Sequence, residues 1–347
     1  MEKKKILMIG LGSIGQRHVR NLRTLYGDRV ELIAYRSRGH KTTFTDKLQI
    51  REGVDVEQEY GITSYTDLGE ALAQKPDIAF ITNVTAKHME CAQKAAEAGC
   101  HLFIEKPLGA SMDGVDRLEK TVKEKNLVVY LGFQNRYHPC VQQVKKLLVE
   151  GTLGTLLYAE ADFSERVTTM HTYEDYRQTY MARKDLGGGP VLNLQMHDLD
   201  LLQWFFGMPQ TVVSLLQKES DLEIDVEEGA SAILRFPRKG GSFMVTAHTD
   251  FLRYPPTHRL RIVGSEGRVD ADLLAATCRV QIGEGSPEET AYPDFVRNDM
   301  FLRELREFTD CVERGDTDPP IGLQDGIRAL QIAEAIKDPA AGNNAGR

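Results

Sequence analysis

Short apolar segments alternate with amphipathic segments over the first 135 residues of the chain. The apolar runs have the length of buried strands and lie at 4–10, 30–36, 76–83, 100–107 and 127–133. The segments between them repeat apolar residues with a helical period, at 13–27, 66–75, 85–99 and 111–126. This alternation predicts an α/β fold whose parallel sheet is doubly wound, with helices on both faces.

The pattern changes after about residue 135. A helix is expected at 139–151, a strand at 155–165 and a helix at 190–206, with a long polar stretch between the last two. Several strands then follow one another, at 210–217, 229–237, 241–250, 258–267 and 267–273, before two helices at 298–315 and 323–337. Successive strands with short turns favour a mostly antiparallel sheet. We therefore expect two domains, residues 1–133 and 134–347.

Composition narrows the classes of protein. The chain has 347 residues, 41% of them hydrophobic, and a formal net charge of −8, which argues against a general affinity for nucleic acid or anionic membrane. No run of about 18 apolar residues is present, and glycines break the apolar start, so we expect neither a membrane span nor an export signal. The five cysteines form no CxxC pair, which favours reduced thiols in a cytoplasmic protein and no metal site.

The first candidate site is a G-x-G-x-x-G motif made by Gly10, Gly12 and Gly15, with Ser13 and Ile14 inside it. It follows a predicted strand and opens a predicted helix, which is the context of a dinucleotide-binding turn. The glycines allow a tight turn, close approach of a pyrophosphate and close helix packing, while the helix N-terminus offers N–H groups to the phosphates. The alternative is an ordinary strand-to-helix turn.

The end of the second strand bears on which dinucleotide binds. An NAD site normally has an acidic residue there, but no acid lies between Glu31 and Asp46, and Arg36, Ser37 and Arg38 follow the strand instead. Arginine suits a 2′-phosphate because its planar, charged fork binds oxyanions. The sequence thus favours NADP(H), with NAD(H) as the other cofactor to consider. The alternative is that these arginines are solvated.

Glu105, Lys106 and Pro107 stand at the carboxyl end of another predicted strand. In an open α/β sheet that edge binds ligands, and the following proline restricts the backbone of Lys106, so its side chain is aimed. Lys106 is a candidate acid/base beside the nicotinamide, and Glu105 is counted among the cofactor-binding residues. A surface lysine is the alternative from position alone.

The helix expected at 190–206 carries Asn193, His197 and Asp200 at i, i+4 and i+7, hence on one face. Pro190 in its first turn and Gly207 after it are ordinary helix boundaries. Taken alone, His197 fits a structural histidine better than an acid/base.

Four segments together resemble a known family: "GLGSIGQRH", "ITNVTAKHMECAQKAAEAGCHLFIEKPLG", "GFQNRYHP" and "GGGPVLNLQMHDLDLLQWFFG". Their order and spacing are similar to the Gfo/Idh/MocA oxidoreductases over nearly the whole chain. The resemblance implies an N-terminal Rossmann domain, a C-terminal α/β domain with a large, mostly antiparallel open sheet, and a homo-oligomer, dimer or tetramer, formed through that sheet. It also implies a sugar or polyol substrate, oxidised at a ring hydroxyl or reduced at the ketone.

The resemblance also implies roles for single residues. Lys106 matches the family's lysine and His197 its catalytic histidine, while Asn193 stands where many members carry Asp. Arg136 matches a position beside nicotinamide and substrate. The loop beneath the cofactor is matched by Thr82, Asn83 and His88.

The polar stretch before Gly189 contains Tyr176 and Arg177, whose ring and cation suit a sugar ring with an anionic group. The alternative is a structural loop whose tyrosines pack on the sheet.

Together these observations predict an NADP(H)-dependent oxidoreductase that acts on a sugar, amino sugar or related polyol. Two alternatives stay open: a dinucleotide-binding sensor without catalysis, and an enzyme for a non-sugar carbonyl such as a dihydrodiol.

Overall fold

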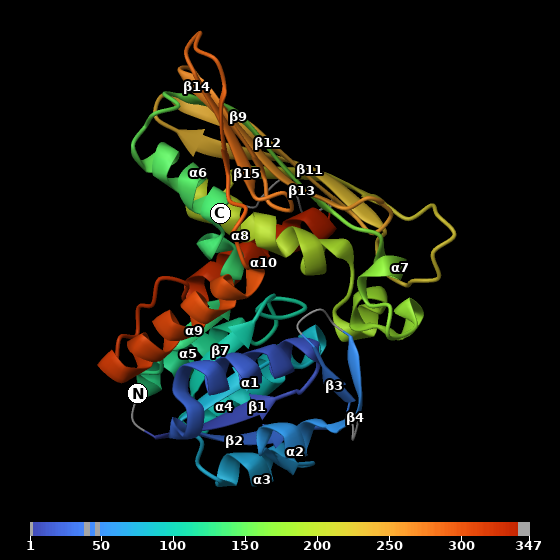
Figure 1. Ribbon diagram of the computed structural model, residues 1–347. Coiled ribbons are helices and arrows are strands. Elements are labelled where there is room, and N and C mark those ends of the chain that lie inside the picture. The colour runs from blue at the N-terminus through green and yellow to red at the C-terminus, as the bar shows by residue number, and fades with distance from the viewer. Residues whose placement is uncertain (1–2, 38–41, 46–48, 339–347) are drawn as a thin grey trace. The chain divides into compact units, whose positions relative to one another are not determined.

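The computed structural model describes residues 3–37, 42–45 and 49–338 (Figure 1). Two compact units are present. The first runs to Gly132 and includes Phe301–Ile327; the second comprises Phe133–Met300 and the chain from Arg328 onward. Residues 301–327, which sequence analysis places in the second domain, thus lie in the first unit. Arg38, one of the predicted cofactor residues, lies outside the described residues.

The first unit is built on a parallel sheet of six strands in the order β5-β2-β1-β6-β7-β8. The strands are β1 (Lys4–Ile9), β2 (Val30–Tyr35), β5 (Thr63–Tyr65), β6 (Ile78–Ile81), β7 (His101–Glu105) and β8 (Val129–Gly132). Strand order reverses between β1 and β6, so right-handed crossovers place helices on both faces. The doubly wound parallel sheet predicted from the sequence is confirmed, and its ligand edge lies at the carboxyl ends of β1 and β6.

Helices connect these strands much as the apolar periodicity predicts. They are α1 (Ser13–Tyr26), α2 (Val56–Tyr60), α3 (Leu68–Ala73), α4 (His88–Glu97) and α5 (Val115–Lys125), with the short turns η1 (Gly27–Arg29) and η2 (Thr85–Lys87). Helix α9 (Arg297–Arg314), near the end of the chain, also packs on this unit. Its Glu307 accepts a hydrogen bond at 2.9 Å from the hydroxyl of Tyr130 on β8. Helix α10 (Leu323–Lys337) follows it.

A small hairpin stands where the sequence showed only a polar stretch. It is formed by β3 (Thr42–Phe44) and β4 (Ile50–Asp55). Gln16 of α1 donates to the Thr42 carbonyl at 2.8 Å and accepts from the Phe44 N–H at 2.8 Å. Arg20 of the same helix donates to the Phe44 carbonyl at 2.9 Å. The hairpin is therefore fixed to the helix that follows the glycine motif.

The second unit contains an eight-stranded sheet in the order β10-β11-β12-β9-β13-β14-β15-β16. Its strands are β9 (Leu156–Ser164), β10 (Thr211–Gln217), β11 (Gly229–Arg238), β12 (Gly241–Asp250), β13 (Thr257–Gly264), β14 (Gly267–Asp272), β15 (Thr277–Ile282) and β16 (Glu288–Ala291). Only the β12–β9 pair is parallel, since β9 enters the sheet from a different part of the chain. The mostly antiparallel sheet predicted from the sequence is confirmed.

Alternate residues of this sheet face a buried layer, including Val212, Leu234, Val245 and Ile262. Helical segments cover that layer, among them α6 (Pro139–Val149), η7 (Val191–Gln195) and α8 (Met196–Phe206), and η3 (Gln134–Tyr137) contacts α6 and α8. The helix predicted at 190–206 is thus present, but its first turn, η7, is a π-helix. It ends before Gly207, which has a φ of 80°. Among the described residues, no helix is long and apolar enough to cross a membrane.

Candidate active site

The glycine motif in the first unit is packed tightly at two of its three glycines. Gly10 has a φ of 105°, and a Cβ there would lie 2.8 Å from the Asn83 backbone nitrogen. A Cβ on Gly15 would collide with the Gly10 carbonyl oxygen. The Thr82 hydroxyl donates to that same carbonyl at 2.8 Å. Thr82 and Asn83 therefore pack directly against the turn. This close packing explains why Gly10 and Gly15 have no room for a side chain.

Gly12 is different, because nothing lies within 4 Å of the position a Cβ would occupy. Its φ of −69° is open to any residue. The open space lies at the start of α1, where the first N–H groups of the helix, those of Ser13 and Ile14 included, have no partner within the helix. A side chain at Gly12 would fill the space that a pyrophosphate needs, so the motif fits a dinucleotide.

Arg36 directly follows β2, as predicted, but its guanidinium is engaged. Its Nη1 lies 2.6 Å from Glu57 Oε1, and the Arg36 side chain is only 7% exposed. Ser37 is exposed. One cation of the expected phosphate site is therefore buried and already paired with a carboxylate.

Lys106 stands at the carboxyl end of β7, half-buried, and its peptide bond to Pro107 is cis. His88 supports this segment: its Nδ1 lies 2.8 Å from the Pro107 carbonyl and its Nε2 lies 3.0 Å from the Asn83 carbonyl. Burial lowers the pKa of His88, although both carbonyls act in the opposite direction. His88 thus links the two loops that carry Asn83 and Lys106.

Glu105, the residue before Lys106, is bound inside the unit. Its Oε1 lies 2.6 Å from Nε2 of His18 on α1, and both side chains are buried. The ring of His18 packs edge-on against Phe103, 4.9 Å between centroids. This pair joins the helix of the glycine motif to the strand that ends at Lys106. Direct cofactor contact from Glu105, Thr82, Asn83 and His88 stays a prediction.

In the second unit, glycines also precede the helix that carries Asn193 and His197. A Cβ on Gly188 would lie 2.6 Å from the Tyr180 carbonyl oxygen, and one on Gly189 would overlap the Glu227 carboxylate. Burial raises the pKa of Glu227, while Lys337 and the N–H groups of Glu227 and Val191 act against the rise. The two glycines let a loop and a buried carboxylate approach the start of this helix.

Asn193 is held by the backbone at the start of this helix. Its backbone N–H and its Nδ2 both donate to the Gly189 carbonyl, at 3.0 and 3.3 Å, and the residue is 4% exposed. A π-helical turn, with its i→i+5 hydrogen bonds, changes the angular spacing that an α-helix would give. The amide at position 193 is therefore a fixed group rather than a mobile one.

His197 is buried in the second unit and is supported by aromatic rings. Its ring lies 6.2 Å from that of Phe163, which stacks on His258 at 3.9 Å. His258 Nε2 in turn lies 2.8 Å from Oδ1 of Asp198, the neighbour of His197 in the chain. Burial raises the pKa of Asp198, and His258 partly offsets the rise. This support was not predictable from the sequence, because Phe163 on β9 and His258 on β13 lie far from His197 along the chain.

Asp200, the third polar residue predicted on this helix face, pairs with Arg136. Oδ2 accepts from Arg136 Nε at 2.9 Å, and Oδ1 accepts from Nη2 at 2.6 Å. The guanidinium also lies 5.1 Å from the Trp204 ring centroid. The two side chains are 4% and 1% exposed. Arg136 is therefore part of a buried ion pair, and its contact with cofactor or substrate stays a prediction.

We expect Asp200→Ala to lower the free energy of unfolding by about 3–5 kcal/mol, because it leaves the Arg136 charge buried and unpaired. Urea denaturation measures the change. Asp175→Ala is the matched control, since it breaks an exposed pair with Arg177 and should change stability far less. An equal effect of the two variants would contradict the structural role of the buried pair.

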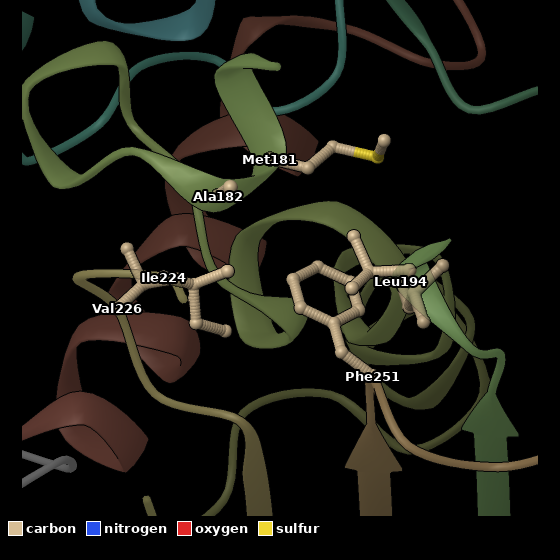
Figure 2. Close-up of a cluster of buried hydrophobic side chains, with 7 residues drawn as sticks. Met181, Ala182, Leu194, Ile224, Val226 and Phe251 are labelled. Carbon is tan, nitrogen blue, oxygen red and sulfur yellow. The ribbon is translucent and has the colours of Figure 1, made fainter. Parts of the chain in front are cut away.

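The polar stretch 165–188 is ordered by its own small core (Figure 2). A cluster of buried side chains joins this stretch to η7 and to segment 222–226, and it consists of Val167, Met181, Ala182, Leu194, Ile224, Val226 and Phe251. Tyr176 packs against this cluster. Arg177 contacts Asp175 at 2.7 Å and Glu223 at 2.9 Å. Both predicted substrate residues thus hold the loop, and substrate contact from them stays a prediction.

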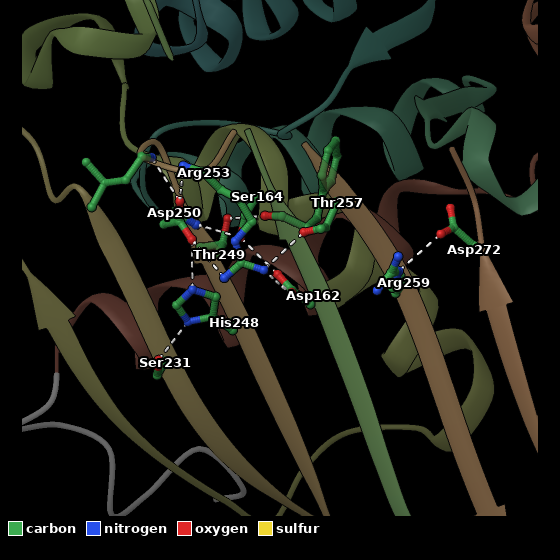
Figure 3. Close-up of polar contacts among 12 residues, drawn as sticks. Asp162, Ser164, Ser231, His248, Thr249, Asp250, Arg253, Thr257, Arg259 and Asp272 are labelled. Carbon is green, nitrogen blue, oxygen red and sulfur yellow. Dashed lines mark hydrogen bonds and ion pairs between the residues drawn. The ribbon is translucent and has the colours of Figure 1, made fainter. Parts of the chain in front are cut away.

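A polar network fixes the start of the same loop at the end of β12 (Figure 3). Asp250 accepts from the N–H groups of Leu252 and Arg253, and His248 lies between Asp250 and Ser231, at 2.9 and 2.8 Å. Burial acts to raise the pKa of Asp250, but these hydrogen bonds outweigh it and lower the pKa to about 2. The Asp250 carbonyl then accepts from the Glu165 N–H at 3.0 Å, where the loop begins.

Comparison with known proteins agrees with this architecture. Residues 4–133 match the model of an oxidoreductase family with an NAD-binding Rossmann fold, and residues 141–270 match the GFO/IDH/MocA C-terminal domain. The chain therefore belongs to the Gfo/Idh/MocA family of oxidoreductases.

Relatives and solved structures cover nearly the whole chain. A myo-inositol 2-dehydrogenase of Thermotoga maritima is 27% identical over 96% of this chain and 95% of its own length. A D-xylose 1-dehydrogenase (NADP(+)) of Haloferax volcanii is 24% identical over 82% and 85%. A levoglucosan dehydrogenase solved with NADH superposes with a TM-score of 0.82 over 98% of both chains, at 18% identity, which shows a shared fold.

Proposed function

We propose that this protein is a dehydrogenase that moves a hydride between a nicotinamide cofactor and a ring CH–OH of a sugar, amino sugar or related polyol. The observation that carries the proposal is the presence of two titratable side chains, Lys106 and His197, in a chain whose glycine motif leaves open space at Gly12. Named relatives that oxidise inositol and xylose support this substrate class. We assign cofactor binding to residues 1–133 and substrate binding mainly to the second unit, which begins at Phe133 and does not include Phe301–Ile327.

The bound nicotinamide supplies the hydride acceptor or donor. His197 takes the proton of the substrate hydroxyl during oxidation, since histidine is the side chain whose ordinary pKa lies closest to neutral pH. Lys106 donates a hydrogen bond to the same oxygen and stabilises its growing negative charge. Asn193, held by Gly189, orients the substrate by hydrogen bonds and adds no charge.

A substrate screen tests the proposed class. The purified protein is offered sugars, amino sugars, polyols and a trans-dihydrodiol with NADP⁺ or NAD⁺, and nicotinamide reduction is followed by absorbance. Turnover of at least one sugar or polyol is expected. Turnover of the dihydrodiol alone would move the protein to the non-sugar alternative.

We further propose that NADP(H) binds more tightly than NAD(H), on the strength of Arg36 and Arg38 after β2. Fluorescence titration with NADPH and NADH measures the difference. We expect the double change of Arg36 and Arg38 to Ala to remove it by weakening NADPH while leaving NADH nearly unchanged. Equal affinities in the unaltered protein would mean that the arginines do not read the 2′-phosphate.

The outer face of the second sheet supports a homo-oligomer. Four apolar side chains lie on one face of β10, β11 and β12 and are 48–78% exposed: Val213, Leu215, Ile233 and Met244. An apolar patch of this kind on a sheet is typical of a protein interface. We propose that a second copy of the chain covers it.

The five cysteines are all buried thiols, which fits our placement of the protein in the cytoplasm.

We expect Leu215→Asp to convert a dimer or tetramer to a smaller species, because a carboxylate cannot be buried in an apolar interface without cost. Light scattering after size exclusion gives the mass. Val149→Asp is the control, since Val149 is 75% exposed outside this sheet. A monomeric starting protein, or a variant of unchanged mass, would rule out this interface.

A further inference from the structure

Glu57 lies beside Arg36 at the end of β2, although it is remote in sequence from this strand. In a Rossmann fold the end of this strand is where the adenosine ribose of a dinucleotide binds. It stands in the first turn of α2, and its Oε1 is 2.6 Å from Arg36 Nη1. In a site of this fold, the residue at the end of β2 reads the 2′ position of the adenosine ribose. The sequence has no acid directly after β2, but the folded chain brings one there.

The position of Glu57 is fixed by several contacts. Asp55 caps α2 by accepting from the Glu57 N–H at 2.8 Å. Arg23 of α1 donates to the Tyr60 carbonyl at 2.9 Å, at the end of α2. The hairpin that leads into α2 is held by Gln16 and Arg20. The Arg36 N–H bonds the Tyr65 carbonyl at 3.0 Å. Both charges are therefore held by the fold rather than by chance surface contact.

The pair has opposite consequences for the two cofactors. A 2′-phosphate approaching Arg36 also meets the negative charge of Glu57, which reduces the attraction of the buried guanidinium. A ribose 2′-hydroxyl can instead donate to the carboxylate, as it does to the acid of an ordinary NAD site. Glu57 is 24% exposed, so its charge is screened only in part.

We propose that Glu57 is a specificity-determining residue that narrows the preference for NADP(H) over NAD(H). This inference rests on the proposed dinucleotide site. With Glu57 present, the arginines favour the 2′-phosphate, and the carboxylate keeps NAD(H) as a usable cofactor. Without the negative charge of Glu57, the Arg36 guanidinium can pair fully with the 2′-phosphate.

The test compares NADPH and NADH affinities of the unaltered protein, Glu57→Gln and Glu59→Gln by fluorescence titration. Glu57→Gln should tighten NADPH about tenfold and weaken NADH several-fold, the scale of one partly screened charge. Glu59→Gln removes the same charge from the same helix, but Glu59 pairs with Arg51 and not with Arg36. The ratio of NADPH to NADH affinity should therefore stay unchanged in this variant. Glu57→Asp, which keeps the charge but withdraws it, should shift the ratio less in the same direction and serves if Glu57→Gln does not fold.

Two results would overturn the inference. If Glu57→Gln changes both affinities by the same factor, or leaves the affinity for NADPH unchanged, Glu57 does not set the preference between the two cofactors. The proposed dinucleotide site would not be contradicted by this result. If neither dinucleotide binds the unaltered protein, the proposed function fails and this inference fails with it.

Discussion

Replacing His197 or Lys106 by Ala should lower turnover of a sugar substrate by about 10²-fold or more, the effect typical of a positioned acid/base group. In the proposed reaction, His197→Ala removes the proton acceptor, and Lys106→Ala removes the donor that stabilises the developing charge. Asn193→Ala should lower turnover less, because the proposed role of Asn193 is only to orient the substrate. Steady-state rates at saturating cofactor measure all three.

Controls separate a chemical effect from a structural one. Lys94→Ala removes a lysine that is 52% exposed on α4 and should keep the full rate. Dinucleotide affinity should change little in His197→Ala, because His197 is proposed to act on the substrate hydroxyl and is not among the predicted cofactor-binding residues. Near-normal rates in both His197→Ala and Lys106→Ala would contradict their assignment to the reaction.

The second large effect is expected from Gly12→Val. The variant should fold with a melting temperature lowered only slightly, because nothing beyond the chain neighbours lies within 4 Å of the new Cβ and the backbone φ is ordinary, although valine is a poorer N-cap than glycine. Its affinity for dinucleotide should nevertheless fall about 10- to 100-fold, since the side chain occupies the space proposed for the pyrophosphate. Titration calorimetry and a thermal melt give the two quantities.

Two further variants sharpen this prediction. Gly12→Ala should lose less affinity than Gly12→Val, as the smaller side chain fills less space. Gly15→Ala should instead lower stability, because its Cβ collides with the Gly10 carbonyl and the backbone must move. Unchanged affinity in Gly12→Val would show that the pyrophosphate binds elsewhere.

The parts of the fold that local pattern decides were predictable from the sequence. Apolar runs and helical periods gave the parallel sheet, and the short motif around Gly10 gave the turn that carries α1. The β3–β4 hairpin was missed because it has little apolar patterning. It is held by hydrogen bonds from Gln16 and Arg20, which lie at least 24 residues from their partners.

The candidate site divides in the same way. Lys106 and His197 could be proposed from the sequence because they match motifs of the family; position alone left a surface lysine and a structural histidine as alternatives. Their supports do not, because Asp198 pairs with His258 from 60 residues away and Asp200 with Arg136 from 64. Asp200 looked like a third polar group on the helix face, and only a distant arginine reveals its structural role. The same limit hid Glu57, which reaches Arg36 from the next helix.

Isotope transfer tests the central claim most directly. A sugar or polyol that the protein turns over is labelled with deuterium at the reacting ring carbon, and the reduced nicotinamide is examined by mass spectrometry. The proposed reaction predicts that the deuterium is found on the nicotinamide, because the ring C–H leaves as hydride while His197 takes only the hydroxyl proton. Loss of the label to water, or dinucleotide binding with no turnover of any substrate, would contradict the proposed function, and the second result would favour a sensor.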